Sequence, residues 1–390
     1  MTSKQTPVDC FSSSPLGLYV HVPFCATTCD FCAFVQSKPN RKQINRYLSA
    51  LKSEARHCKT LTKKTVHTVF WGGGTPSILL PDDLRTLGGI VHEYWDLGDC
   101  QEWTVEVAPA SVTPSKLKGL KSLGVTRISM GVQSFDPATL EEMGRLHSVN
   151  QIHRAYDWIQ SEGFEQVNLD LIIAFPGQNE DHLLKDLEHA LALKPDHLST
   201  YCLTFEEDTQ LYAKLQKGEY KIDPEKEADL YTSVWNYLEK QGYSQYEVSN
   251  FAKPGCQSIH NLNTWKMHEW IGLGPSASSQ FGGKRWTQNP DFEKWEQGIA
   301  KAQPTCIDES TLTIEDLAND ILIFGLRTIE GVSLKDLGQR TGMDLGAYLP
   351  VLNQLVEEEL ADWHGDTIRL NLNGRLKADA IGVEILSVEA

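Results

Sequence analysis

The sequence has no long apolar run. None of its apolar stretches approaches the roughly 18 residues that a membrane-spanning helix needs. The N-terminal segment before Cys10 also lacks the apolar core of a secretory signal peptide. We therefore expect a cytoplasmic protein without a transmembrane segment. Peripheral contact with a membrane stays open.

Basic residues are scarce relative to acidic ones. The 390-residue chain has 36 Lys and Arg against 52 Asp and Glu, which gives a formal net charge of −16. Because binding to nucleic-acid phosphates depends on clustered Lys and Arg, this balance argues against a nucleic-acid partner. Hydrophobic residues make up 41% of the chain, which is typical of a globular protein with a large core.

The cysteines of the chain also lack the pattern of a disulfide-bonded protein. The chain has nine cysteines, an odd number, and six of them stand singly, at Cys10, Cys58, Cys100, Cys202, Cys256 and Cys306. Scattered thiols in a chain of this length do not form a disulfide framework. They indicate a reducing compartment.

The other three cysteines form the run Cys25-x3-Cys29-x2-Cys32. The apolar segment 18–24 before them is typical of a strand, so the thiols should lie at its carboxyl end, where α/β proteins place their sites. A structural zinc ion takes four closed ligands, whereas a [4Fe–4S] cluster can leave one iron open. Three cysteines therefore favour such a cluster. The alternatives are a zinc site completed by a residue such as Cys58, or three unrelated buried thiols.

Short apolar runs alternate with amphipathic patterns between residues 16 and 250, which indicates repeated βα units and a parallel sheet. The predicted strands are 16–24, 65–72, 102–108, 127–133, 166–175 and 197–205, and the predicted helices begin near Gln43, Asp82, Pro114, Asn150, Asn179 and Glu225. Gly124, Gly163 and Gly242 stand where helices should end. Six units are too few for a closed eight-stranded barrel, so we expect an α/β fold with a partial (β/α)6 TIM-like barrel at 16–250.

The remaining segments differ from this pattern. Residues 1–15 are expected to be disordered. Residues 251–305 are rich in Gly, Asn, Trp and Ser and predict an irregular lid or substrate region. Residues 306–390 contain three helical patterns followed by a hairpin turn at 363–366, which predicts a small α+β domain of winged-helix type. Its acidic composition makes DNA binding unexpected.

Four motifs together resemble the radical S-adenosylmethionine (SAM) superfamily and, within it, the branch of the HemN and HemW proteins. They are Tyr19-x-His21-x-Pro23-Phe24-Cys25 with the cysteine run, Gly72-Gly73-Gly74-Thr75-Pro76, Gly131-Val132-Gln133-Ser134-Phe135, and residues 170–177. The resemblance covers residues 16–290 and, more weakly, the C-terminal part. It implies a [4Fe–4S] cluster whose open iron binds the amino and carboxylate groups of SAM. Reductive cleavage of SAM then yields a 5′-deoxyadenosyl radical.

The resemblance also implies which side chains hold SAM. The glycine loop would grip the methionyl amine, Arg145 would clamp the carboxylate, and Glu106 and Asp170 would bind the ribose hydroxyls. A carboxylate buried without partners is costly, so the alternative is an ion pair with an arginine such as Arg127. The expected metal ligands are Cys25, Cys29 and Cys32, and the expected cofactor contacts are Tyr19, Phe31, Gly73, Gly74, Thr75, Glu106, Gln133, Arg145, Asp170, Thr204 and His260. Phe31 and Thr204 mark where a second SAM could lie.

Two departures separate this chain from HemN-type dehydrogenases. Those enzymes carry a fourth cysteine where this chain has Phe34, and a longer extension than the 18 residues before Tyr19. Both departures favour the HemW-type heme chaperones, which deliver heme to acceptor hemoproteins. The other interpretations are an oxygen-independent coproporphyrinogen III dehydrogenase and a radical SAM methyltransferase. Whether the chain is an enzyme, and whether it forms a homodimer, stay open.

The stretch from Ser258 to Trp265 resembles the heme-binding stretch His-Asn-x-x-Tyr-Trp of the HemW proteins, with Thr264 in place of the tyrosine. The resemblance implies that His260 binds heme iron as a neutral imidazole while Trp265 packs on the macrocycle. The alternative for His260 is an ordinary hydrogen-bonded histidine.

Overall fold

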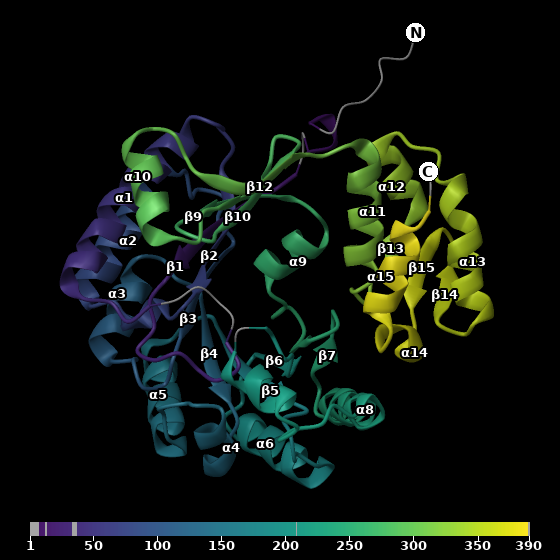
Figure 1. Cartoon of the computed structure of the whole chain (residues 1–390), viewed down its shortest axis with the longest axis horizontal. Coiled ribbons are helices and arrows are strands. Elements are labelled where there is room, and N and C mark those ends of the chain that lie inside the picture. Colours follow the sequence, from purple (N-terminus) through teal and green to yellow (C-terminus); the bar gives the residue numbers. More distant parts are fainter. Residues whose placement is uncertain (1–7, 12–13, 33–36, 208, 389–390) are drawn as a thin grey trace.

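A parallel sheet of six strands lies at the centre of the molecule, and a helix that follows each strand covers its outer face (Figure 1). The computed structural model describes residues 8–11, 14–32, 37–207 and 209–388. The strands are β1 (Leu16–Val22), β2 (Val66–Gly73), β3 (Glu102–Val107), β4 (Arg127–Gln133), β5 (Gln166–Ile173) and β6 (His197–Cys202), side by side in chain order. The helices are α1 (Arg41–Lys59), α2 (Pro81–Tyr94), α3 (Pro114–Ser122), α5 (Val149–Glu162), α6 (Glu180–Ala192) and α8 (Pro224–Lys240). The predicted α/β partial barrel is confirmed.

Three shorter elements lie in the loops of these units. They are η2 (Pro76–Ile78) after β2, α4 (Pro137–Glu142) after β4, and α7 (Gln210–Gln216) after β6. The glycines that should end helices do adopt the left-handed backbone this requires, with φ of 93° at Gly124, 68° at Gly163 and 84° at Gly242.

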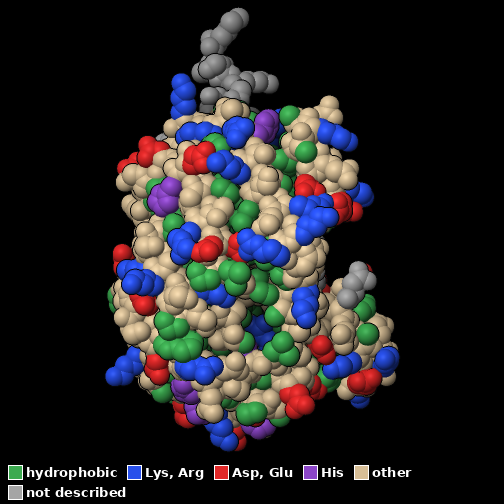
Figure 2. All heavy atoms as spheres, turned by 90° about the vertical axis from the view of Figure 1, so that its left-hand side faces the viewer, with side chains coloured by type: hydrophobic (Ala, Val, Ile, Leu, Met, Phe, Trp, Pro, Cys, Tyr) green, Lys and Arg blue, Asp and Glu red, His purple; other side chains and the backbone are tan. Residues whose placement is uncertain are grey.

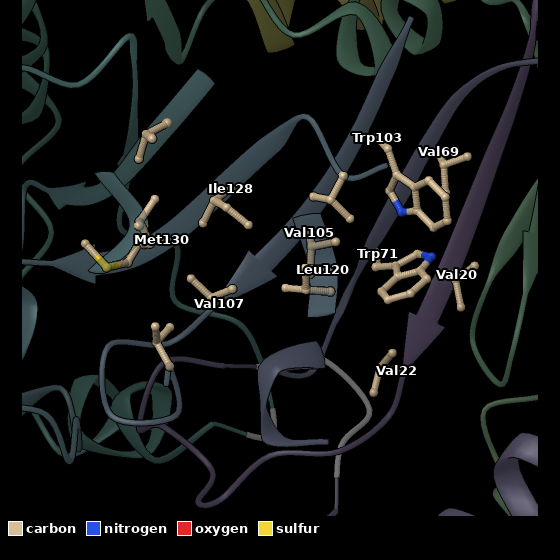
Figure 3. Packing of buried hydrophobic residues seen from close by; sticks show 14 of the residues in the cluster. Val20, Val22, Val69, Trp71, Trp103, Val105, Val107, Leu120, Ile128 and Met130 are labelled. Atoms are coloured by element: carbon tan, nitrogen blue, oxygen red, sulfur yellow. The ribbon is translucent and has the colours of Figure 1, made fainter. Parts of the chain in front are cut away.

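Alternate side chains of the strands point to opposite faces of the sheet. Figure 3 shows the outward set, in which valines of β1 and β2 pack with Trp71 and Trp103, whose rings meet edge to face with centroids 5.3 Å apart. Leu120 of α3 joins the same cluster. The apolar outward face leaves the inner face of the sheet for polar residues such as Glu106.

The sheet extends beyond the six units. On one side of β1 lie β9 (Glu269–Leu273), β10 (Ser278–Phe281), β11 (Lys284–Gln288) and β12 (Cys306–Thr311), and beyond β6 lie β8 (Asn250–Ala252) and β7 (Ser244–Gln245). Strand β9 pairs with β1 in parallel. Residues 251–305 are thus mostly regular, with α9 (Ile259–Trp265) and α10 (Phe292–Ala300) as well, and the expectation of an irregular segment is wrong. Its strands are short, and the glycines in the turns between them, Gly274, Gly282 and Gly283, obscured their alternation.

The C-terminal residues form a separate small core of helices and a three-stranded antiparallel sheet. The helices are α11 (Ile314–Gly325), α12 (Leu334–Thr341), η3 (Gly346–Tyr348), α13 (Leu349–Glu357), α14 (Leu372–Arg375) and α15 (Ala378–Leu386), and the strands are β13 (Val332–Ser333), β14 (Ala361–His364) and β15 (Thr367–Leu370). This arrangement confirms the predicted α+β domain, with its hairpin at β14 and β15.

Part of the N-terminal segment is structured, contrary to the expectation of disorder over 1–15. Residues Asp9–Phe11 form a single turn, η1. Cys10 and Phe11 are buried in the core of the C-terminal domain, and the Arg340 guanidinium lies 5.5 Å from the Phe11 ring centroid. The carbonyl of Phe11 also accepts a 2.7 Å hydrogen bond from Lys64. Burial of one aromatic ring thus orders this short segment.

The face over α1, α2 and α3 carries Lys and Arg mixed with Asp, Glu and hydrophobic side chains (Figure 2). This mixture does not form the broad basic surface that phosphate binding would require. No helix in the described ranges is both long and apolar enough to cross a bilayer.

A buried ion pair joins the sheet to α9. Arg127 Nε donates to Glu102 at 3.0 Å, and both side chains are almost fully buried. The same Glu102 carboxylate accepts hydrogen bonds from Ser258 Oγ and from the backbone N–H groups of Ile259 and His260, each at 3.1 Å. A carboxylate at the start of a helix satisfies N–H groups that have no partner within the helix.

We predict that Glu102→Ala lowers the free energy of unfolding by about 3–5 kcal/mol, because it leaves Arg127 buried without its counter-charge. Urea titration would measure the loss. The control is Glu309→Ala, which removes the exposed partner of Lys284 and should cost under about 1 kcal/mol. Equal losses in the two variants would contradict the role given to this pair.

Candidate cofactor site

The cysteine loop lies at the carboxyl end of β1, as predicted. Two backbone hydrogen bonds of Asp30 hold the middle of this loop. The Asp30 N–H donates to the Met143 carbonyl, and the Asp30 carbonyl accepts from the Leu211 N–H. Cys25 Sγ lies 3.2 Å from the Thr75 hydroxyl, and Arg145 Nη1 donates to Cys29 Sγ at 3.1 Å. The three thiols are all partly exposed.

Burial is the main cause that raises the pKa of Cys25 to about 11, and the nearby Cys32 and Cys29 add to the rise. The cysteine thiols are therefore close enough to influence one another. Among the described residues, no three His, Cys, Asp or Glu side chains could hold a single metal ion. Cys58, the suggested fourth zinc ligand, lies instead on the buried face of α1, near Glu54 and Cys306. In a [4Fe–4S] cluster each thiolate binds a different iron, so the thiols need not meet at one point.

The glycine loop after β2 lies against the cysteine loop. Gly74 N–H donates to Val22 at 2.9 Å and Thr75 N–H donates to Phe24 at 2.7 Å. A Cβ atom on Gly74 would lie 2.6 Å from the Phe24 carbonyl oxygen, and Gly73 has a φ of 99°. Only glycine allows this close approach of two backbones.

Glu106 of β3 and Asp170 of β5 face each other across the inner side of the sheet. Burial and then the Asp170 charge raise the pKa of Glu106 to about 8. Burial also raises the pKa of Asp170, although hydrogen bonds from Asn168 and Ser129 oppose the shift. Arg127 pairs with Glu102 instead, so the alternative of an ion pair with Arg127 is wrong for both carboxylates.

The backbone at the carboxyl end of β4 is irregular, next to the candidate site. Gln133 has a φ of 71°, and the pairing of β4 with β5 shifts register between Gly131 and Gln133. A residue other than glycine in this conformation stores strain, which is typical of functional sites. The side chains of Gln133 and Arg145 both lie close to Gly131.

Sequence reasoning missed His21. Its Nδ1 lies 3.1 Å from the Tyr19 hydroxyl, and a Cβ on Gly73 would lie 2.5 Å from its ring. His21 therefore supports both Tyr19 and the glycine loop from the inner face of β1. The two-residue spacing of Tyr19 and His21 in a strand was the signal that could have shown this.

Phe31 belongs to a small apolar cluster that also contains Leu203 and Phe205, the neighbours of Thr204. Thr204 itself is exposed. The structure thus brings the two residues expected near a second SAM to one region. Phe34, the position of the absent fourth cysteine, lies outside the described residues.

His260 and Trp265 point to different surroundings. His260 is 8% exposed, its Nδ1 lies 2.8 Å from the Thr68 hydroxyl, and its ring stacks on Phe70 inside the sheet. Burial lowers the pKa of His260 to about 4. Trp265 instead packs near Phe324 of α11. The two side chains do not share a face on which one macrocycle could rest.

Comparison with known proteins agrees with this geometry. The model of the radical SAM superfamily matches residues 19–190, and that of the HemN C-terminal domain matches residues 312–376. A heme chaperone HemW from Bacillus subtilis is 34% identical over 93% of this chain and 97% of its own length. The chain belongs to the HemW family of radical SAM proteins.

Other relatives extend the comparison. HemW of Mycobacterium tuberculosis is 33% identical, with 98% of each chain covered. The structure of coproporphyrinogen III oxidase (HemN) from Escherichia coli superposes with a TM-score of 0.84, covering 97% of this chain and 92% of that one, at 24% identity. That likeness shows the shared fold alone.

The family implies a [4Fe–4S] cluster and SAM, and the described residues fit both. The cysteine loop offers three partly exposed thiols, and beside it Arg145 Nε is buried without a hydrogen-bond partner in the described structure. Among the described residues Glu106 and Asp170 form no salt bridge, although the Arg145 charge opposes the rise in the pKa of Asp170, and both carboxyl groups can accept hydrogen bonds from a ligand.

The raised pKa of Glu106 predicts a pH dependence of stability. Between about pH 5 and pH 8 the folded protein without ligands keeps a proton that the unfolded chain has lost, so stability falls as pH rises through this window. Glu106→Gln cannot ionise and should lose less stability over the same range. Thermal unfolding of both proteins at about pH 5 and pH 8 tests this prediction. The exposed Glu165→Gln is the control and should lose as much stability as the wild type. An equal loss of stability with pH in Glu106→Gln and in the wild type would contradict the prediction.

The cysteine assignment predicts that Cys25→Ala, Cys29→Ala and Cys32→Ala each abolish the charge-transfer absorption of the anaerobically reconstituted protein. Cys58→Ala should keep it, because Cys58 lies in the core. Iron that survives any of the first three changes, or is lost in Cys58→Ala, would favour another ligand set.

Proposed function

We propose that the protein is a heme chaperone that carries a SAM-ligated [4Fe–4S] cluster and transfers heme to acceptor proteins in the cytoplasm. The observation that supports this most strongly is the similarity, over nearly the whole chain, to proteins named heme chaperone HemW. The glycine loop, Glu106 and Asp170 support the SAM part of the proposal.

Cys25, Cys29 and Cys32 would hold the cluster, whose open iron would bind SAM. The backbone of Gly73 and Gly74 would receive the methionyl amine, and Arg145 Nε would donate to the carboxylate. Glu106 and Asp170 would accept hydrogen bonds from the ribose hydroxyls. A protonated Glu106, favoured by its pKa of about 8, can also donate a hydrogen bond at neutral pH.

His260 is the proposed iron ligand. The lowered pKa keeps its imidazole neutral at pH 7, which is the form that binds iron. Thr68 occupies Nδ1, so iron would be bound by Nε2. Because His260 is 8% exposed, α9 has to move before heme can reach it. This makes α9 a mobile element of the proposed transfer.

The second candidate is oxygen-independent oxidation of coproporphyrinogen III. The fold shared with the Escherichia coli HemN enzyme favours it, but a likeness of fold carries no activity with it. A carrier should bind heme and leave SAM intact, whereas the dehydrogenase must release 5′-deoxyadenosine as it turns over.

The test gives anaerobically reconstituted protein heme or coproporphyrinogen in parallel. We expect a heme Soret band and transfer of heme to an apo-hemoprotein, without conversion of coproporphyrinogen. His260→Ala should perturb the Soret band and reduce transfer at least tenfold while the cluster spectrum stays unchanged. His268→Ala is the control, because that ring contacts Asn263 instead of the sheet interior.

Decarboxylation of coproporphyrinogen coupled to release of 5′-deoxyadenosine, with no heme binding, would overturn the chaperone in favour of the dehydrogenase. A wild-type Soret band in His260→Ala would remove His260 as the ligand and leave the chaperone proposal standing.

A further inference from the structure

The Arg145 guanidinium lies between the cysteine loop and the inner face of the sheet. Nη1 donates to Cys29 Sγ at 3.1 Å, and Nη2 donates to the Gly131 carbonyl at 3.3 Å. The carbon of the guanidinium lies 5.8 Å from the centroid of the Phe31 ring. Three groups, two in the cysteine loop and one in β4, thus set its orientation.

The backbone around Arg145 holds this geometry. Arg145 N–H donates to Leu140 at 2.9 Å, and Gly144 turns the chain with a φ of 70°. A Cβ on Gly144 would lie 2.7 Å from the Asp30 carboxylate. Since Asp30 N–H donates to the Met143 carbonyl at 3.1 Å, the residue after Cys29 is tied directly to the segment that carries Arg145.

We propose that Arg145 tunes the reduction potential of the cluster through its hydrogen bond to the Cys29 sulfur. This inference rests on the cluster of the proposed function and adds a role that SAM binding does not require. Reduction adds one electron from an external low-potential donor and makes the thiolate sulfurs more negative, with no bond made or broken. A positive donor at sulfur stabilises that state and raises the potential.

The Arg145 side chain has one more donor, Nε–H, so it could contact SAM and the cluster at the same time. Nε–H is buried and has no partner in the described structure, while Nη1 is committed to sulfur. A carboxylate bound at Nε would therefore share its counter-charge with the cluster. Arg145 would be a positioning residue for SAM and a tuning residue for the cluster.

The experiment is an EPR-monitored redox titration of the reconstituted cluster without SAM or heme. Arg145→Gln should reduce the ratio of reduced to oxidised cluster at least tenfold at a fixed potential, which corresponds to a downward shift of 59 mV for a one-electron couple. Arg145→Lys keeps the charge but loses the planar fork, so its shift should be smaller. Iron content is measured for every variant.

The control is Arg154→Gln, which removes the same charge from the exposed face of α5, where Arg154 lies over the Trp158 ring. It should titrate like the wild type. An unshifted Arg145→Gln cluster would overturn this inference and leave the proposed function intact, whereas a wild-type protein that assembles no cluster would overturn the proposed function itself. Should Arg145→Gln fail to hold iron, Arg145→Met, which has neither a charge nor a donor, takes its place, and an unshifted Arg145→Met cluster overturns the inference.

Discussion

The close approach of two backbones at the end of β1 determines the rest of the site. Because β1 and β2 pair in parallel with Val22 opposite Gly73, the loops that follow them must leave the sheet side by side. Gly74 can then lie against the Phe24 carbonyl, which brings Thr75 to Cys25. Cofactor contacts far apart in the chain thus meet through strand register, and side-chain bonds refine what the backbone has already arranged.

Much of the fold and of the cofactor site could be predicted from the sequence. Buried parallel strands have a strong apolar pattern, so the carboxylates Glu106 and Asp170 stand out within two predicted strands, and the resemblance to radical SAM proteins marks them as candidate SAM contacts. The partners that support them were less accessible. Ser129 Oγ of β4 donates to Asp170 from the neighbouring strand, and only the register of β4 with β5 reveals that contact, whereas Asn168 donates to Asp170 along β5 itself.

The surroundings of His260 could not be read from the chain. A histidine in a short polar stretch gives no sign of whether it faces solvent or the inside of a sheet. Its burial depends on Glu102, which lies in β3 and holds the first N–H groups of α9. The strands between residues 269 and 288 were not predicted for a related reason. Short segments that are interrupted by glycines take their conformation from a neighbouring strand.

The burial of Phe11 in the core of the C-terminal domain has a consequence for biosynthesis. This turn leaves the ribosome before α11 and the rest of the C-terminal core that buries it have been translated. The ring must stay in solvent, or in temporary contacts, while the barrel forms. Folding of the C-terminal domain then buries this ring, so the turn at Asp9–Phe11 and the C-terminal helices complete one core together.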